Sequence, residues 1–242
     1  MPRLGLGLGL GRRRAGASVF DATAYGTVKQ WTDLSDDAYV TKVSSAFSAA
    51  VCKAGTGRDW VQGTVADRPT VSTIGTRQAC LGDGVNHWLA STGWTTIASG
   101  TQTIMMVIDP QVSSGTLDYL LHTNSPAFVL AMNTDTDGKV GFYDGAWSSI
   151  ADGATGAQVL TFHAPNTSGG NATMYRNLTS LGADAYTHGA SGTTIAILSN
   201  TVGDPTRCCN TKFGEMVWWA DALTDQARID ATTALMTKWG IS

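Results

Sequence analysis

The sequence predicts an all-β protein: a two-sheet antiparallel β-sandwich of the jelly-roll type, with a short C-terminal α-helix and an extended N-terminal arm. Three observations support this fold class. The chain holds 33 Thr and 28 Gly, and branched side chains favour strands while Gly favours turns. Short apolar runs recur at the spacing of sandwich strands. Near the C-terminus the apolar spacing changes to a helical period.

The apolar runs become regular after Arg68-Pro69 and are separated by turn residues such as Asp144-Gly145 and Ser168-Gly169-Gly170. Before this point the pattern is weak, and it suggests only a short helix around residues 44–51. The predicted strands are Trp88–Ala90, Thr103–Ile108, Tyr119–His122, Phe128–Met132, Val140–Tyr143, Val159–His163, Thr173–Arg176, Thr194–Leu198 and Phe213–Trp219.

The C-terminal residues carry the signals of one helix. Thr224 is suited to cap its first turn, where Asp225 faces the positive end of the helix dipole. Gly240 stands where a left-handed C-terminal cap belongs. One face of this helix is predicted to be apolar and to pack on the sandwich, through Ala227, Ala231, Ala234 and Leu235.

Residues 1–17 differ from residues 18–242, so we expect an extended arm followed by one sandwich domain. Leu alternates with Gly four times and three arginines follow. In a strand-like conformation the leucines project to one side and can enter a groove on a partner. A leader without function is the alternative. The anchor residues predicted in this arm are Leu4, Leu6, Leu8, Leu10, Arg12, Arg13 and Arg14.

Charge, hydrophobicity and cysteine content argue against nucleic acid, membrane and zinc as partners of this chain. The formal charge is −3, and the arm holds four arginines and no acid, which leaves 12 − 19 = −7 for the rest. Without a clustered basic face, nucleic acid is not an expected partner. No apolar run reaches 18 residues, so membrane insertion is not expected. The four cysteines fit no zinc spacing and are expected to be buried thiols made in a reducing cytosol, with Cys52–Cys80 the one pairing worth checking.

Six segments along the chain resemble the concanavalin A-like lectin/glucanase superfamily, in particular its laminin G-like jelly-roll domains. The segments that carry the resemblance are Trp31–Ser35, Arg68–Thr70, Gly82–Leu89, Phe213–Trp219, Ala222–Asp225 and Lys238–Ile241. The resemblance implies a two-sheet jelly roll in which Trp88, Trp218 and Trp239 pack in the core.

The Leu-Gly repeat with its arginines is similar to the start of proteins encoded in bacteriophage and prophage structural gene clusters. Together the two resemblances imply a virion structural or decoration protein, made in the bacterial host cytoplasm, present in many copies or as a homo-oligomer, and anchored to capsid or tail proteins by its arm. The alternatives are a head-fibre or tail adhesin that binds host surface polysaccharide, and a polysaccharide-degrading enzyme. Fold alone does not choose among them.

No catalytic constellation is evident, and we expect no enzymatic activity. Glucanases of this superfamily place their acids on one strand as Glu-x-Asp-x-x-Glu, and glycoside hydrolysis needs a pair of carboxylates. This chain has a single glutamate, Glu215, followed by Met216 and Val217. The four histidines are scattered and form no metal-ligand motif.

One segment approximates the oxygen-ligand spacing of a Ca²⁺ loop. Its candidate ligands are Asn133, Asp135, Asp137 and Asp144. Position twelve is Asp instead of a bidentate Glu, and residues 140–143 have the pattern of a strand. An ordinary Asp-Gly hairpin turn is the competing interpretation, and no other cofactor is predicted.

Two of the eight tryptophans, Trp60 and Trp147, are flanked by polar residues or Gly and are the candidate glycan-binding residues. An exposed aromatic ring can stack on the apolar face of a sugar. The competing interpretation is that each ring anchors a loop by packing inward.

Overall fold

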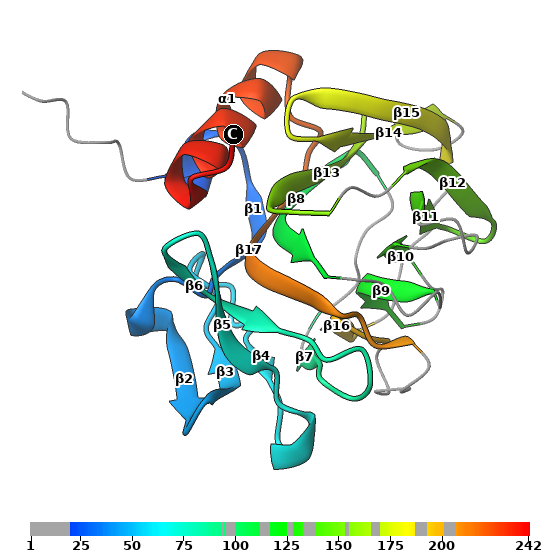
Figure 1. Cartoon of the computed structure of the whole chain (residues 1–242). Helices are drawn as coiled ribbons and strands as arrows, with labels where there is room; N and C mark the ends of the chain where they lie inside the picture. The colour runs from blue at the N-terminus through cyan, green and yellow to red at the C-terminus, as the bar shows by residue number, and fades with distance from the viewer. Residues whose placement is uncertain are drawn as a thin grey trace, which may run out of the picture.

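The computed structural model describes residues 20–92, 94, 100–111, 117–124, 128–132, 139–152, 155–165, 170–186, 193–200 and 207–242, and shows antiparallel strands with one helix near the C-terminus (Figure 1). The predicted fold class is confirmed. The strands are β1 (Val28–Asp33), β2 (Val40–Val43), β3 (Ala46–Ala50), β4 (Trp60–Val61), β5 (Thr70–Ile74), β6 (Arg77–Leu81), β7 (Leu89–Ser91), β8 (Gln102–Pro110), β9 (Asp118–Thr123), β10 (Val129–Met132), β11 (Lys139–Tyr143), β12 (Trp147–Asp152), β13 (Gln158–Ala164), β14 (Gly170–Arg176), β15 (Thr179–Tyr186), β16 (Ile195–Ile197) and β17 (Thr211–Trp219).

The strand pairings divide into two layers. The first sheet runs β15-β14-β13-β8-β17-β1, and the β5–β6 hairpin joins one end of β17. The second sheet runs β12-β11-β10-β9-β16-β7-β4-β3-β2. A single β3–β5 pairing connects the two layers.

Alternation along the strands separates two cores. On β8, Ile104 and Met106 face the second sheet, in the core between the layers, whereas Met105 and Val107 face the opposite side. Side chains of a strand point alternately to the two faces of its sheet, so the continuous apolar run of β8 reflects burial on both faces. The first sheet therefore lies in the middle of the molecule, between the second sheet and the C-terminal helix.

The helix α1 (Asp225–Trp239) covers the outer face of the first sheet (Figure 1). The Thr224 side chain accepts a hydrogen bond from the amide of Ala227, and Gly240 has the left-handed φ of 65° that favours glycine. Leu235 and Trp239 belong to the core beneath the helix, so the predicted boundaries and buried face are confirmed. Among the described residues, no helix has both the length and the hydrophobicity that a membrane crossing requires.

Short 3₁₀ turns lie at the N-terminal end of the described chain, as η1 (Ala22–Ala24), η2 (Asp37–Tyr39) and η3 (Val65–Asp67). The helix expected around residues 44–51 is wrong, because this segment contains β3. Phe47 and Ala50 of that strand are buried in the main core, and β3 pairs with both β2 and β4. Tertiary burial overrides the local helix preference of an alanine-rich segment.

All four cysteines are free and buried, so the Cys52–Cys80 pairing does not form in this structure. Burial raises the pKa of the Cys80 thiol, which makes this thiol a structural hydrophobe and not a reactive group. The predicted arm, residues 1–17 with Leu4 to Arg14, lies outside the described residues.

Candidate functional sites: a buried charge network and an aromatic face

A bulge at Gly214 orients the single glutamate toward the helix. Pairing between β17 and β8 shifts register between Phe213 and Glu215. Phe213 consequently packs in the core between the sheets, while Glu215 faces the helix side together with Val217. A β-carbon on Gly214 would lie 2.5 Å from the ring of Trp239. Only glycine at this position lets the helix end approach the sheet so closely.

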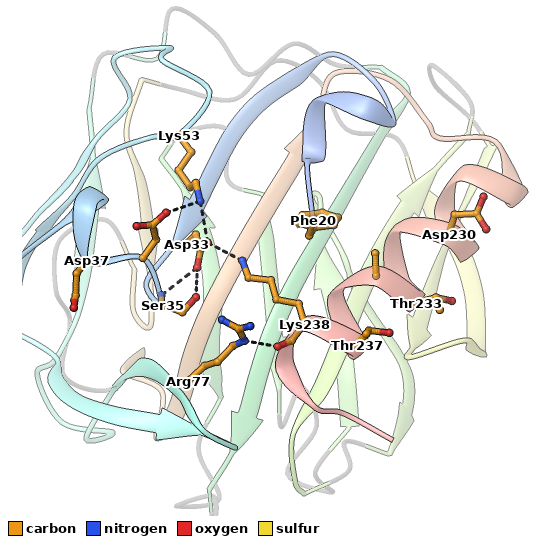
Figure 2. A pocket seen from close by; sticks show the side chains of 12 residues that line it. Phe20, Asp33, Ser35, Asp37, Lys53, Arg77, Asp230, Thr233, Thr237 and Lys238 are labelled. Carbon is orange, nitrogen blue, oxygen red and sulfur yellow. Dashed lines mark hydrogen bonds and ion pairs between the residues drawn. The ribbon is translucent and has the colours of Figure 1, made fainter. Parts of the chain in front are cut away.

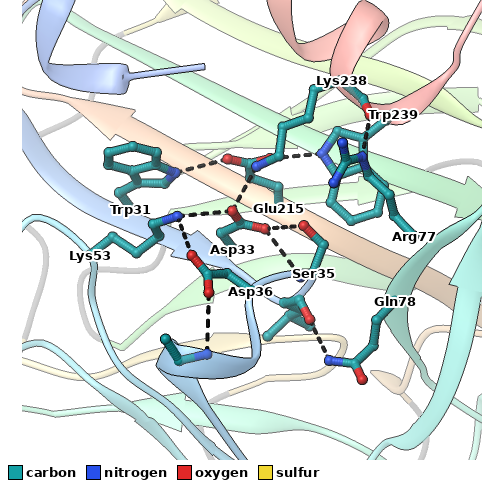
Figure 3. A network of polar contacts seen from close by, with 12 residues as sticks. Trp31, Asp33, Ser35, Asp36, Lys53, Arg77, Gln78, Glu215, Lys238 and Trp239 are labelled. Carbon is teal, nitrogen blue, oxygen red and sulfur yellow. Dashed lines mark hydrogen bonds and ion pairs between the residues drawn. The ribbon is translucent and has the colours of Figure 1, made fainter. Parts of the chain in front are cut away.

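Glu215 is the centre of a buried polar network (Figure 3). It is fully buried, and its Oε1 accepts a hydrogen bond from the indole of Trp31 at 2.8 Å. Its Oε2 accepts from the indole of Trp239 at 2.7 Å and from Lys238 Nζ at 2.6 Å. Asp33, directly opposite Glu215 on the neighbouring strand, binds the same Lys238 Nζ at 2.6 Å.

The remaining hydrogen-bond and ion-pair partners of Asp33 are in the loop after β1 and at Lys53 (Figure 3). Its Oδ1 accepts from the Ser35 hydroxyl at 2.6 Å, and its Oδ2 binds Lys53 Nζ at 3.1 Å. Lys53 also contacts Asp36 at 3.0 Å. Two like charges opposite each other on adjacent strands are destabilising. Here the two lysines offset that repulsion.

The two central carboxyls are shifted in opposite directions. Burial raises the pKa of Glu215, and the nearby Asp33 carboxylate raises it further. Burial alone would also raise the pKa of Asp33, but Lys238, Ser35 and Lys53 hold it below its ordinary value. Two carboxyls with separated pKa values are the arrangement that acid–base enzymes use.

A cavity of about 650 Å³ lies beside this network, between the helix and the loop after β1 (Figure 2). Asp33, Lys53 and Lys238 line it, but Glu215 does not. Arg77, also in its wall, donates to the backbone carbonyl of Lys238 and so fastens the helix end. The full set of lining residues is Phe20, Asp33, Ser35, Asp36, Asp37, Lys53, Arg77, Asp230, Thr233, Ala234, Thr237 and Lys238.

Access decides what the two carboxyls can do. A general acid must come within hydrogen-bond reach of its substrate, yet Glu215 is fully buried and both of its oxygens are bound by groups of the protein. Asp33 is 3% exposed and both of its oxygens are bound as well. The network is therefore suited to hold the helix, β1 and β17 together.

A second candidate site lies on the outer face of the second sheet. A row of side chains crosses β16, β9, β10, β11 and β12 at Ala196, His122, Val129, Tyr143 and Trp147. The residues that directly precede or follow these five on their strands point to the opposite face of the sheet. Val129 is buried but belongs to neither core, as expected for a residue beneath outer-face rings.

The rings of this row form one contiguous cluster with Tyr119. The Tyr143 and Trp147 ring centroids are 5.2 Å apart, and those of Tyr119 and Trp147 are 6.2 Å apart. Tyr119 stacks on His122 with an interplanar angle of 15°. The Arg207 guanidinium lies 5.6 Å from the centre of the Tyr119 ring. We call Tyr119, His122, Tyr143, Trp147 and Arg207 the aromatic face.

Exposure distinguishes Trp147 from the tryptophans of the two cores. Trp147 is 37% exposed, whereas Trp60, Trp94, Trp218 and Trp219 are at most 2% exposed. Burial lowers the pKa of His122 to about 4, so its imidazole is neutral at pH 7. The aromatic face thus combines open π surfaces with one half-buried guanidinium.

The two predicted glycan contacts have different outcomes. Trp60 is completely buried in the core between the sheets, and its indole donates to the Thr32 hydroxyl. It cannot stack on a sugar at the surface, so that prediction is wrong. Trp147 is exposed at the start of β12, next to the turn that holds Asp144. Sequence reasoning missed Tyr119, His122 and Tyr143, which strand register brings to Trp147, and Arg207, which contacts Tyr119.

The predicted Ca²⁺ loop lies only partly within the described residues, so it stays a prediction. Residues 139–143 form β11 and are paired on both sides, with β10 and β12. Asn133, Asp135 and Asp137 lie outside the described residues. In the described part of the chain, no group of three or more His, Cys, Asp or Glu side chains is arranged to hold a metal ion.

No protein-family model matches the sequence, and neither does any curated protein. Solved structures do resemble the fold. Domain 4 of AbnA, a GH43 extracellular arabinanase from Geobacillus stearothermophilus solved in complex with arabinotriose, matches with a TM-score of 0.57 and 12% identity over 86% of this chain and 99% of that domain. At this identity the match defines only the class of fold, an antiparallel β-sandwich.

Two further structures share the fold. The binding domain of Paraclostridial Mosquitocidal Protein 1 has a TM-score of 0.57 and 9% identity, over 87% of this chain and 52% of that one. Trypanosoma rangeli sialidase in complex with sialic acid has a TM-score of 0.58 and 12% identity, over 88% of this chain and 33% of that one. The chain therefore spans about half of the first protein and a third of the second.

Proposed function

We propose that this chain is a glycan-binding β-sandwich without enzymatic activity. The observation that carries the proposal is the aromatic face, where the 37%-exposed Trp147 contacts both Tyr119 and Tyr143 on the outer side of the second sheet. Exposed aromatic rings supply the apolar platform on which sugar rings stack. The fold likeness to a domain solved with arabinotriose supports the same function.

Trp147→Ala is expected to weaken glycan binding at least about tenfold, which corresponds to about 1.4 kcal/mol, because aromatic anchors carry much of the energy of an interface. The measurement is a glycan array followed by titration of the best ligand. Leu178→Ala is the control, since Leu178 is 48% exposed and lies at the β14–β15 turn of the other sheet. Equal losses in both variants would contradict the assignment of the site.

The absence of catalysis is part of the proposal. It is supported by the burial of Glu215 and by the engagement of all four oxygens of Asp33 and Glu215 within the protein. The same glycans, incubated with the protein, should release no reducing sugar. Release that disappears in Glu215→Gln but persists in Trp147→Ala would identify an enzyme instead.

We also propose that the domain is a bacteriophage virion component, attached to capsid or tail proteins by residues 1–17. The support is the sequence of the arm, in which four leucines alternate with glycine before three arginines. Ordering such a segment costs about 1–2 kcal/mol of backbone entropy per residue. A partner groove that buries the leucines would offset this cost.

Deletion of residues 1–17 tests the attachment. The truncated protein should melt like the full chain and bind glycan with the same affinity, because a free chain has no reason to order a Gly-rich segment at this entropy cost. It should fail to join particles when supplied to assembling virions in place of the full chain. Normal incorporation would mean that the sandwich itself makes the contact.

A further inference from the structure

The aromatic face carries one formal cation in direct contact with its rings. Arg207 lies over Tyr119 within the range of a cation–π contact. Among the described residues Arg207 forms no ion pair, unlike Lys53, Lys212 and Lys238, each of which contacts an aspartate. A guanidinium held on a ring keeps the N–H groups at its edge directed outward, where they can bind a planar anion in bidentate fashion.

The charges of the rest of the chain favour binding of an anion at Arg207 alone. The chain outside residues 1–17 carries a formal charge of −7, which disfavours non-specific attraction of polyanions. Neutral His122 adds no positive charge at pH 7. An anionic group is therefore favoured beside Arg207 and not across the whole face.

We propose that the aromatic face binds a glycan that bears a carboxylate, such as a hexuronate or sialate residue, with Trp147 and Tyr143 under the sugar rings and Arg207 paired with the carboxylate. This inference rests on the proposed glycan-binding function and adds the class of ligand. No bond is made or broken, and the ligand leaves unchanged.

The test compares each acidic polymer with its own carboxyl-reduced form, in which the carboxylate becomes a primary alcohol and the sugar backbone is otherwise kept. The probes are hyaluronan, polygalacturonate and polysialic acid, titrated against the full chain at fixed ionic strength. Dextran sulfate measures non-specific attraction of a polyanion. We expect at least one acidic polymer to bind at least about tenfold more tightly than its reduced form, as a charge-assisted contact predicts.

Variants separate the two parts of the proposal. Arg207→Gln should remove the preference for the acidic form and leave binding of the reduced form unchanged, and Arg207→Lys should retain part of the preference. Trp147→Ala should weaken binding of both forms. Arg176→Gln removes the same charge from β14 of the other sheet and should change neither.

The outcomes are distinguishable. Equal affinity of wild-type protein for acidic and reduced forms, an unchanged preference in Arg207→Gln, binding of dextran sulfate that matches the best acidic polymer, or no binding of any acidic polymer would each overturn this inference. If neutral glycans still bound in a Trp147-dependent manner, the glycan-binding function would stand. Failure of every neutral and acidic glycan to bind would overturn both.

Discussion

Lys238→Met is expected to lower the free energy of unfolding by about 3–5 kcal/mol at pH 7, because removing one partner from a buried ion pair leaves an uncompensated charge. The Lys238 Nζ lies 2.6 Å from both the Asp33 and the Glu215 carboxylates. Without it, two carboxylates face each other across neighbouring strands with only Lys53 nearby. Methionine keeps most of the side-chain volume, so the change measures the charge and not a cavity.

The pH dependence of this loss follows from the two carboxyls. In the native protein the pKa of Asp33 is lower than its value of about 4 in the unfolded chain. The ionised Asp33 therefore stabilises the fold above about pH 4, and this stabilisation is lost as the pH falls through the pKa of the folded state. Without Lys238 both carboxyls should have raised pKa values in the folded state. The free energy of unfolding of the variant should then decrease as pH rises from about 4 to 7. The difference in unfolding free energy between the variant and the wild type should therefore be smaller in acid than at pH 7.

Lys212→Met is the matched control for urea unfolding. Lys212 pairs with Asp109 at 3.0 Å, but this pair is partly exposed, and such pairs contribute about 0–1 kcal/mol. A loss in Lys238→Met no larger than in the control, or one that did not change with pH, would show that the network does not hold the helix to the sheet.

The sequence predicts the strands and the helix whose own residues show a clear pattern of burial or capping. Every strand expected between Trp88 and Trp219 is present, since a run of apolar residues bounded by turns is sufficient to mark a buried strand. The helix was predictable to within a residue because Thr224 and Gly240 are local signals. The strands β1 to β6, β12 and β15 were not predicted; among them, β2 has no buried residue and β4 has only two residues, too few for a periodic pattern.

Strand register brings the residues of the candidate sites together, so the sequence alone does not show that they are neighbours. Asp33 and Glu215 are opposite each other on β1 and β17, yet nothing in either local sequence indicates that the other is near. The bulge at Gly214 decides which way Glu215 points, and bulges are not readable from alternation alone. Trp147 could be proposed as exposed from its polar neighbours, but its contacts with Tyr119 and Tyr143 require three correctly aligned strands.

Leu235→Ala is expected to lower the free energy of unfolding by about 2–5 kcal/mol, the range found when a large apolar side chain is removed from a core. Leu235 is 1% exposed and packs in the core between the helix and the outer face of the first sheet. That face includes Trp31, Met105 and Val217, which no strand of the second sheet can cover. The helix is thus needed to bury them.

The site of glycan binding should not respond to this change, because the helix and the aromatic face lie on opposite sides of the first sheet. Ile229→Ala is the control, as Ile229 is a helix residue that is 37% exposed and substitutions at such surface positions usually stay within about 0.5 kcal/mol. Urea unfolding measures both variants, and titration with the best glycan at 10 °C measures binding by the folded fraction. A Leu235→Ala protein that unfolded like the Ile229→Ala control would show that the helix is peripheral. One that kept its stability relative to the control but lost glycan affinity would place recognition on the helix side of the molecule.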